Sequence, residues 1–217
     1  LKHSRKDIKK INQLAQHFLK KSYPLDPVLN AYRKYIDHKP EDTNAVFNYA
    51  WYLTRAARYE EALAAYESIM NIDAPGLDEI HLNIANLWMD HLGDHEKARE
   101  HIEYVFTLNP RHVGAWHNLG NLFEQRGERE EAARCFNNCL ALDPQNESAL
   151  ARLADTQIFE NDDNPILARL QATALHSRNS DVHFALGRAC DQLQRYDEAW
   201  EHLSKANQLD REDYPAF

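Results

Sequence analysis

The sequence predicts an all-α protein, an α-solenoid built from about six helix-turn-helix hairpins. The first observation is a pattern of apolar and small residues that recurs about every 34 residues along most of the chain. The second is spacing, because within each recurrence the apolar positions lie three or four residues apart, as they do on one face of a helix. The third is composition: 217 residues with only 6 glycines, 43% hydrophobic and 27% charged, which is typical of a folded, helix-rich chain.

The clearest unit is the stretch VGAWHNLGNLFEQRGEREEAARCFNNCLALDPQN, residues 113–146, numbered as positions 1 to 34 of a repeat. Positions 4, 7, 8, 11, 15, 20, 24, 27 and 32 hold Trp116, Leu119, Gly120, Phe123, Gly127, Ala132, Phe136, Cys139 and Pro144. This pattern resembles the tetratricopeptide repeat, with Cys139 where that family usually has a small alanine. The resemblance implies paired antiparallel helices stacked into a right-handed superhelix with a concave face.

The signature residues each have a physical role. Gly120 and Ala132 are small, so the axes of the paired helices can approach to about 8–10 Å. Gly127 suits the tight turn between the two helices, and Pro144 ends the second helix because it has no backbone N–H to donate.

The same register extends in both directions, which predicts a single array over residues 1–217. A two-residue insertion, Leu77-Asp78, interrupts the register, and the stretch FENDDNPILARL makes one unit degenerate, with its turn at Asn161 to Pro165. The expected units are approximately 9–42, 43–76, 79–112, 113–146, 147–179 (the degenerate one) and 180–213.

Tetratricopeptide proteins line their concave groove with first-helix side chains that point away from the packing face. We expect this chain to bind a peptide or protein partner there, through Asn48, Trp51, Asn83, His117, Asn118, Asn121 and Arg152. Leu87 falls in the same register set, and Phe47 and Trp51 are candidate aromatic anchors. An amide offers two N–H donors and an acceptor, so recurring asparagines can pair with the main chain of an extended peptide. The alternative is that they are simply polar residues at exposed helix positions.

The family's carboxylate clamp, which holds the C-termini of chaperones, needs Lys and Asn at positions 5 and 9 and further Asn, Lys and Arg residues in the following units. The nearest match in this chain is His117 with Asn121, followed by Arg152 but by no second cation. We therefore expect that the clamp is absent.

Charge and composition argue against several other classes of function. The net charge of −9 disfavours nucleic acid as the main partner. The longest apolar run is about five residues, far below the roughly 20 that span a bilayer, so we expect no membrane insertion and a cytoplasmic protein. The three cysteines, at 135, 139 and 190, do not form a disulfide framework and are expected to be reduced.

The N-terminal stretch is basic: residues 1–21 hold seven Lys or Arg and one acid. We expect a solvated face on a terminal helix, with a contact for an acidic partner or a neighbouring subunit as the alternative. Contacts through the ends of the array, including Tyr214 to Phe217, would allow a homo-oligomer.

Motifs for catalysis, metals and cofactors do not occur in the sequence. There is no HExxH or CxxC pattern and no phosphate-binding glycine loop. His91 and His95 flank Gly93 in an expected turn, and His112 and His117 are five residues apart, so neither pair shares a helix face. We expect no enzymatic activity, no metal and no cofactor for this chain.

The last hairpin carries a second resemblance, in His183–Gly187 (HFALG), Tyr196–Ala199 (YDEA) and Ala206-Asn207. Residues 150–217 are similar to the region before the catalytic domain in bacterial proteins that join tetratricopeptide repeats to a sulfotransferase. Two functions therefore stay open. One is an interaction module that forms the N-terminal, non-catalytic part of a larger protein; the other is a sulfotransferase's repeat domain, which positions substrate or mediates oligomerisation.

Overall fold

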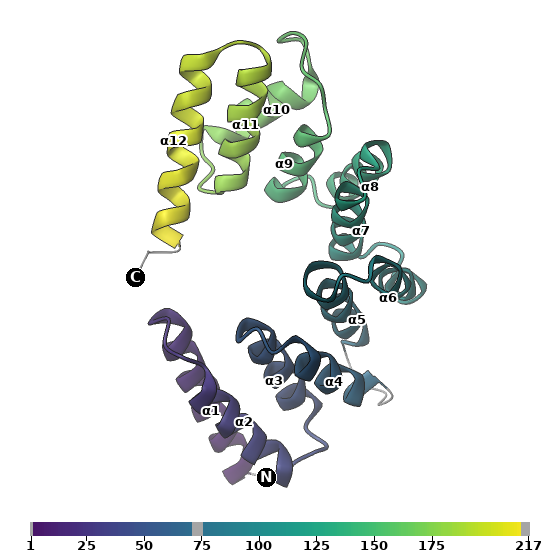
Figure 1. Ribbon diagram of the computed structural model, residues 1–217, viewed down its shortest axis with the longest axis vertical. Coiled ribbons are helices and arrows are strands. Elements are labelled where there is room, and N and C mark those ends of the chain that lie inside the picture. The colour runs from purple at the N-terminus through teal and green to yellow at the C-terminus, as the bar shows by residue number, and fades with distance from the viewer. Residues whose placement is uncertain (1, 71–75, 214–217) are drawn as a thin grey trace. The chain divides into compact units, whose positions relative to one another are not determined.

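The structure is a computed structural model that describes residues 2–70 and 76–213, with side chains over 7–70 and 76–212. These residues form twelve α-helices and one π-helical turn and contain no strand, so the all-α prediction is confirmed (Figure 1). In chain order the elements are α1 (Lys2–Lys20), α2 (Asp26–His38), α3 (Thr43–Arg55), α4 (Tyr59–Met70), α5 (Leu77–Leu87), η1 (Trp88–Leu92), α6 (His95–Leu108), α7 (Val113–Gln125), α8 (Arg129–Leu142), α9 (Glu147–Asp155), α10 (Pro165–Ala174), α11 (Ser180–Gln192) and α12 (Tyr196–Asp213).

The chain divides into two compact units, Leu1–Pro110 and Arg111–Phe217. In the first unit α1 packs on α2, α3 on α4 and α5 on α6, and successive hairpins meet through α2 with α3 and α4 with α5. In the second unit the pairs are α7 with α8, α9 with α10 and α11 with α12, joined by α8 with α9 and by α9 with α11. Each unit is therefore a short series of helical hairpins, as the repeat register predicts.

The boundaries of three elements differ from the expected ones. The first helix begins at Lys2, well before the expected start at residue 9, and the inserted Leu77-Asp78 forms the first turn of α5. The fifth expected unit has a short first helix, α9, and its second helix starts at Pro165, which the sequence placed in the turn. Proline is well suited to this place, because the first residue of a helix needs no N–H donor.

Side-chain caps explain where several helices start. In the first unit the carboxylates of Asp42 and Asp94 accept from the N–H groups of the third residue on, at 3.1 and 3.0 Å. In the second unit the amide oxygen of Asn146 accepts from the third residue on, at 2.9 Å, and those of Asn164 and Asn179 accept from the second residue on, at 2.8 and 2.9 Å. Each cap satisfies a donor that the helix itself leaves unpaired.

Each unit has its own apolar core. In the first unit it is centred on Tyr32, Leu53, Tyr66 and Ile84, all fully buried. In the second unit it runs from α8 to α12 and includes the fully buried Phe136, Leu153, Leu167 and Leu170. Neighbouring hairpins share these buried side chains, as expected for stacked repeats that cannot each form a core alone.

Small residues bring the paired helices together, as the signature predicts. A Cβ added to Gly120 would stand 2.6 Å from the ring of Phe136, and one added to Gly187 would stand 2.7 Å from the side chain of Leu203. Gly120 and Gly187 share one repeat position, and Phe136 and Leu203 share another. The prediction that small residues permit close helix packing is confirmed at both places.

The helix α5 continues into the π-helical turn η1, which Gly93 ends with left-handed backbone (φ 73°). A π turn accommodates an extra residue within a helix. In this one Trp88 packs against the core of the first unit, and His91 lies on Tyr59 of α4 with ring centroids 4.0 Å apart. The turn therefore helps to join the second and third hairpins.

Candidate partner-binding faces

In the second unit the first helices of the hairpins, α7, α9 and α11, are linked by ion pairs. Arg152 of α9 lies 3.6 Å from the carboxylate of Glu124 on α7. Arg188 of α11 donates two hydrogen bonds to the carboxylate of Asp155 on α9, at 2.8 and 2.6 Å. All four residues are at positions that the register assigns to the groove, so this face is polar and charged. We call it the α7–α9–α11 face.

Three of the predicted site residues, His117, Asn118 and Asn121, are half-buried on α7 at this face. The Asn121 amide nitrogen lies 3.3 Å from His117 Nδ1, which is long for a hydrogen bond. The other polar atoms of this pair, His117 Nε2 and Asn121 Oδ1, are buried and have no hydrogen-bond partner among the described residues. The pair is therefore loosely held, and turning Asn121 outward would break one weak contact.

Burial and charge set the protonation of this face. Burial lowers the pKa of His117 below its usual value, and the Arg152 guanidinium lowers it further, whereas Asp181 and a hydrogen bond with Asn118 oppose this. The imidazole is therefore neutral at pH 7 and can present an acceptor as well as a donor. Burial raises the pKa of Glu124, and Arg152 opposes that shift.

In the first unit the predicted residues Asn48, Trp51 and Asn83 lie on α3 and α5 and are half-buried. Trp51 packs partly against the core, and the Arg55 guanidinium lies 5.3 Å from its ring centroid. Asn83 donates its amide N–H to the carbonyl of Glu79 in its own helix, at 2.7 Å. Trp51 is thus part core and part surface, and one donor of Asn83 is already used.

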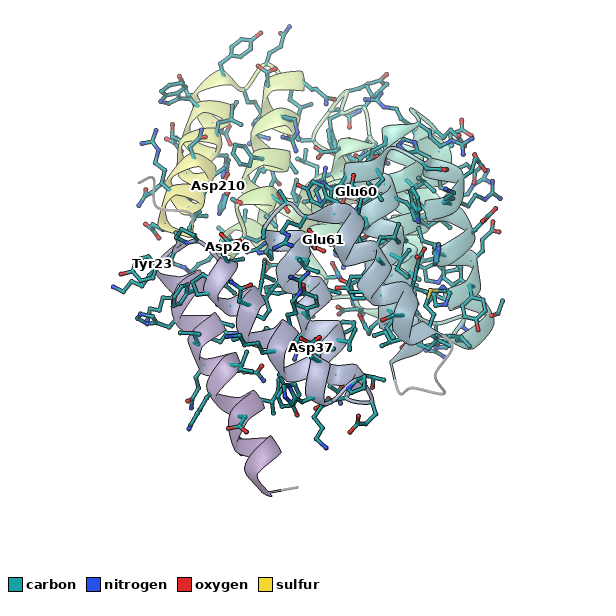
Figure 2. The ribbon with its side chains drawn as sticks, turned by 60° about the horizontal axis from the view of Figure 1, so that its bottom comes forward. Tyr23, Asp26, Asp37, Glu60, Glu61 and Asp210 are labelled. Atoms are coloured by element: carbon teal, nitrogen blue, oxygen red, sulfur yellow. The ribbon has the colours of Figure 1, made fainter. Side chains whose placement is uncertain are left out.

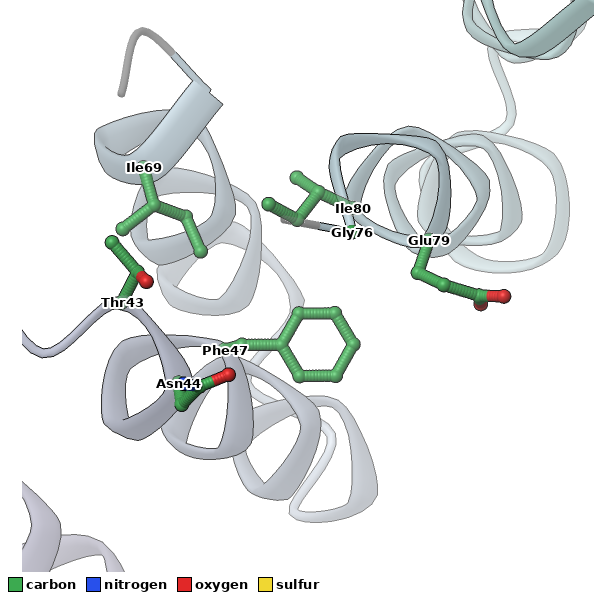
Figure 3. Close-up of a pocket in the computed structure, with 7 residues that line it drawn as sticks. All are labelled: Thr43, Asn44, Phe47, Ile69, Gly76, Glu79 and Ile80. Carbon is green, nitrogen blue, oxygen red and sulfur yellow. The ribbon is translucent and has the colours of Figure 1, made fainter. Parts of the chain in front are cut away.

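A small pocket of about 200 Å³ opens between α3, the end of α4 and the start of α5 (Figure 3). The ring of Phe47 projects into it, beside Ile69 and Ile80. The same ring meets Tyr66 edge-on, with centroids 5.5 Å apart. The repeat register identified Phe47 as a candidate aromatic anchor, whereas Ile69 and Ile80 reach the pocket only through the packing of three helices. The complete lining is Thr43, Asn44, Phe47, Ile69, Gly76, Glu79 and Ile80.

The prediction that Leu87 lines the groove is wrong. Its side chain is 1% exposed and belongs to the core that α5 shares with α3 and α4. An apolar side chain at this position is drawn into the shared core, because burying a leucine stabilises the fold by about 1.5–3 kcal/mol. At the same position α7 carries the polar Asn121, which stays half-buried.

A charged cluster lies where the turn between α1 and α2 meets the turn between α3 and α4. Arg58 donates to both carboxylate oxygens of Glu61 at 2.6 Å, and its third nitrogen is 4.0 Å from Asp26. Figure 2 labels the two acids, Asp26 and Glu61. Tyr23 and Asp26 line a hollow of about 640 Å³ beside it. Because Arg58 is already engaged by two carboxylates, the cluster has little charge left for an anionic ligand.

Two histidine pairs join the helices of one hairpin in each unit, and the sequence reasoning missed both. His81 of α5 and His101 of α6 have their Nδ1 atoms 2.9 Å apart, and His81 also lies on the ring of Tyr104. In the other unit His183 of α11 and His202 of α12 have their Nδ1 atoms 3.2 Å apart. The two members of each pair are about twenty residues apart, so only the repeat register could have brought them to attention.

None of the described helices is both long and apolar enough to cross a membrane. Over residues 7–70 and 76–212 no group of three or more His, Cys, Asp or Glu side chains is arranged to hold a metal ion.

Sequence comparison finds tetratricopeptide repeats and partial relatives. Two family models, both described as tetratricopeptide repeat, match residues 29–75 and 113–216. A segment of 69 residues is 35% identical to the peroxisomal targeting signal receptor of Komagataella phaffii, covering 32% of this chain and 12% of that protein. Another, of 126 residues, is 26% identical to the general transcriptional corepressor ssn6 of Schizosaccharomyces pombe, covering 56% and 11%. The matches therefore span about an eighth or less of these relatives.

Solved structures with the same fold include a tetratricopeptide repeat protein from Parabacteroides merdae, with a TM-score of 0.71 and 18% identity over 92% of this chain and 77% of that one. YrrB, described as a TPR protein with an unusual peptide-binding site, has a TM-score of 0.55 and 18% identity over 82% and 92%. At these identities the likeness concerns the fold alone. The repeat register, the hairpins and the two family matches agree, so residues 29–75 and 113–216 of this chain are tetratricopeptide repeats.

Proposed function

We propose that the chain is a protein-interaction module that binds an extended segment of a partner protein on the α7–α9–α11 face. The observation that carries this proposal is the loosely held pair of His117 and Asn121. A buried acceptor without a partner costs about 1–3 kcal/mol, and the main chain of a bound peptide can supply the missing hydrogen bonds. Binding would thus improve a contact that the free protein makes poorly.

The arginines of the ion pairs on this face offer hydrogen-bond donors to a ligand. Arg152 keeps 44% of its side chain exposed while it faces Glu124, and Arg188 keeps 50% while it binds Asp155. Both guanidinium groups can therefore donate to peptide carbonyls without giving up their carboxylates. A row of amide and guanidinium donors favours recognition of the peptide backbone over recognition of one particular side chain.

In the first unit, we propose that the Phe47 pocket takes one apolar side chain of a partner. At about 200 Å³ it is large enough for an aliphatic or small aromatic group, and Phe47, Ile69 and Ile80 give it an apolar wall. Glu79 at its rim favours a cationic neighbour on the ligand.

Two relatives support peptide or protein binding by likeness. One is YrrB, for which a peptide-binding site is described. The other is the curated receptor from Komagataella phaffii, whose name states that it receives a targeting signal. YrrB is described as a TPR protein, and repeat proteins of this kind use extended concave surfaces for binding.

The proposal is tested with a double variant, Asn118→Ala with Asn121→Ala, and a phage-displayed library of random linear peptides. We expect peptides selected on the native chain to bind the variant at least about tenfold more weakly, as for loss of a central polar contact. The thermal midpoint should fall only slightly, because the Asn121 contact is long and Asn118 contributes one hydrogen bond to His117, worth about 1 kcal/mol.

The matched control is Asn137→Ala with Asn138→Ala, which removes two exposed amides from α8, the second helix of the same hairpin. Titration calorimetry should give the native affinity for this control. Equal affinities for the α7 variant and the native chain would contradict the assignment of the face.

A second candidate rests on the resemblance of residues 181–211 to the last repeat before a bacterial sulfotransferase domain. On this proposal the face holds a substrate protein or positions a catalytic domain encoded beyond residue 217. Reading the parent gene decides it: a downstream strand followed by a phosphate-binding Ser-Gly-Thr loop would support it, and a nearby stop codon would remove it.

A further inference from the structure

The outer face of α12 carries two large aromatic side chains in solvent. Trp200 is 74% exposed and Tyr196 is 62% exposed, and they lie one helical turn apart on the same side of the helix. Each can bury 150–250 Å² on contact with another surface, so leaving both exposed is unfavourable. We call the surface formed by Tyr196, Asp197, Trp200 and Glu201 the α12 face.

Equivalent positions elsewhere in the chain are covered by the next hairpin. Tyr196 has the repeat position of Tyr59, and Trp200 has that of Leu63. Both residues of α4 pack against the core of the first unit, and Tyr59 also stacks on His91 of the following hairpin. In the second unit Ala133 of α8, at the position of Trp200, packs against the core where α8 meets α9. The α12 face therefore has the composition of a surface that receives the first helix of another hairpin.

Charge identifies which helix it would receive. The α12 face carries two acids, Asp197 and Glu201, and no Lys or Arg, whereas the neighbouring Glu198 is already paired with Arg195. Residues 8–25, which include most of α1, contain four lysines and no acid. The helix α1 therefore has the opposite charge, and it is also the first helix of a hairpin.

The C-terminal end of α1 also has exposed aromatic surface. Tyr23, 49% exposed, meets Phe18 edge-on with centroids 5.5 Å apart and meets His17 in the same way at 6.0 Å. Lys20 and Lys21 are exposed beside them. Lys21 has the repeat position of His91, the residue that stacks on Tyr59. We call the surface formed by His17, Phe18, Lys20, Lys21 and Tyr23 the α1 end.

We propose that the α12 face of one molecule docks the α1 end of a second copy of this chain. Lys21 of one copy then lies against Tyr196 of the other, as His91 lies against Tyr59 within a molecule, and a lysine over an aromatic ring is attractive. Lys20 and Lys21 face Asp197 and Glu201, while Trp200 is buried at the centre. Because two different surfaces meet, the contact is heterologous and copies associate head to tail.

The first test is sedimentation velocity of the 217-residue chain over a range of concentrations in low salt. We expect reversible self-association that weakens as salt is added, because exposed charges are screened. The variant Trp200→Glu should raise the dissociation constant at least about tenfold, as for loss of a central aromatic anchor. The control Ile158→Glu changes a residue that is 72% exposed outside both surfaces and should associate like the native chain.

The second test exchanges the charges of the two surfaces. Lys20→Glu with Lys21→Glu should weaken association, and adding Asp197→Lys with Glu201→Lys to the same chain should restore it. Helix content by circular dichroism is measured for every variant, so that a folding defect is recognised. Restoration by the second pair of changes requires folded chains and a contact between these two surfaces.

The third test mixes the two defective chains. The Lys20→Glu, Lys21→Glu chain keeps its α12 face and the Trp200→Glu chain keeps its α1 end, so an equimolar mixture should form dimers and no larger species. A native chain that stays monomeric at every concentration would overturn the proposal. So would association that Trp200→Glu abolishes but the lysine changes leave intact, since two α12 faces would then be meeting each other.

Discussion

The turn between paired helices puts one repeat position into left-handed backbone in four hairpins. Glycine occupies it in two of them, at Gly93 (φ 73°) and Gly127 (φ 77°). The others have Ala57 (φ 56°) and Gln194 (φ 60°). A residue with a Cβ pays about 1–2 kcal/mol to adopt this conformation, so the two turns without glycine hold backbone strain.

Reciprocal substitutions in these turns should change stability in opposite directions. Gly127→Ala should lower the free energy of unfolding by about 1 kcal/mol, because alanine is strained at positive φ. Ala57→Gly should raise it by a few tenths of a kcal/mol to about 1 kcal/mol, since the relief of strain exceeds the entropy lost by the added glycine. Urea unfolding followed by circular dichroism measures both.

The control for this pair of substitutions is Ala64→Gly, at an exposed position inside α4. There glycine should destabilise by about 0.5–1 kcal/mol, as in any helix interior. Destabilisation by Ala57→Gly to the same extent would contradict the strain argument.

Single residues also show what the sequence could predict. Gly120 and Gly127 were assigned correctly, because a close helix approach and a left-handed turn each impose one local requirement. Leu87 was assigned wrongly, because its burial depends on how α5 meets the neighbouring hairpin, which the register of one helix does not contain. The roles of Asn48, Trp51 and Asn83 in binding stay predictions.

At the scale of helices, the histidine pairs connect α5 with α6 and α11 with α12. In each pair one Nδ1–H can donate to the Nδ1 of the other ring, which requires that at least one imidazole be neutral. Burial lowers the pKa of His81 to about 4, with a smaller contribution from the nearby His101. Burial also lowers the pKa of His101, while Glu100 and Glu67 oppose that shift. The folded hairpin therefore disfavours the doubly protonated pair.

The sign of the pH dependence follows from these shifts. A histidine whose pKa is lower in the folded than in the unfolded state makes the unfolded chain bind more protons at acid pH. The stability that the neutral pair contributes is fully present above about pH 6.5 and is lost as the pH falls toward about 4.

A substitution isolates this contribution. His81→Gln removes the titrating group but can still bond to His101, so it should flatten the decline in unfolding free energy between about pH 6.5 and 4. We expect a difference on the order of 2 kcal/mol between the native and variant curves over that range, from the shift in pKa. The control is His38→Gln, at an exposed position in α2, which should leave the native pH dependence unchanged. A curve for His81→Gln that runs parallel to the native one would rule out the histidine pair as the source of the pH dependence.

Signature residues give local information that the sequence alone contains, such as the left-handed turns at Gly93 and Gly127. The expected boundaries of the six units stay predictions, and the contacts between helices were not foreseen. Local spacing does not reveal the histidine pairs, because their members are 20 and 19 residues apart in the sequence. In the structure the ring of His91 stacks on that of Tyr59, so packing accounts for the position of this histidine.

At the scale of the whole molecule, the two compact units each contain their own hairpins and core. A solenoid is stabilised by its repeats and by contacts between neighbours, so a run of several hairpins can fold without the remainder. The prediction of one array over residues 1–217 stays a prediction, because the register alone does not say how strongly the units are coupled.

The second unit should fold when it is produced alone. A fragment of residues 111–217 keeps α7 to α12 and the complete second core, so we expect a helical fragment with a cooperative urea transition. Circular dichroism and the sharpness of the transition are the measurements. A fragment without helical signal, or one that melts without a transition, would show that the core of this unit depends on residues 1–110.

The positions of the cysteines confine thiol reactivity to the second unit. All three, Cys135, Cys139 and Cys190, are buried in the second unit, and residues 1–110 contain none. Burial raises the pKa of the Cys135 thiol to about 11 and that of Cys139 to about 12, so the reactive thiolate is scarce in the folded state. The rate at which a thiol-directed reagent modifies the chain therefore reports local unfolding of residues 111–217, and unfolding of residues 1–110 does not contribute to it.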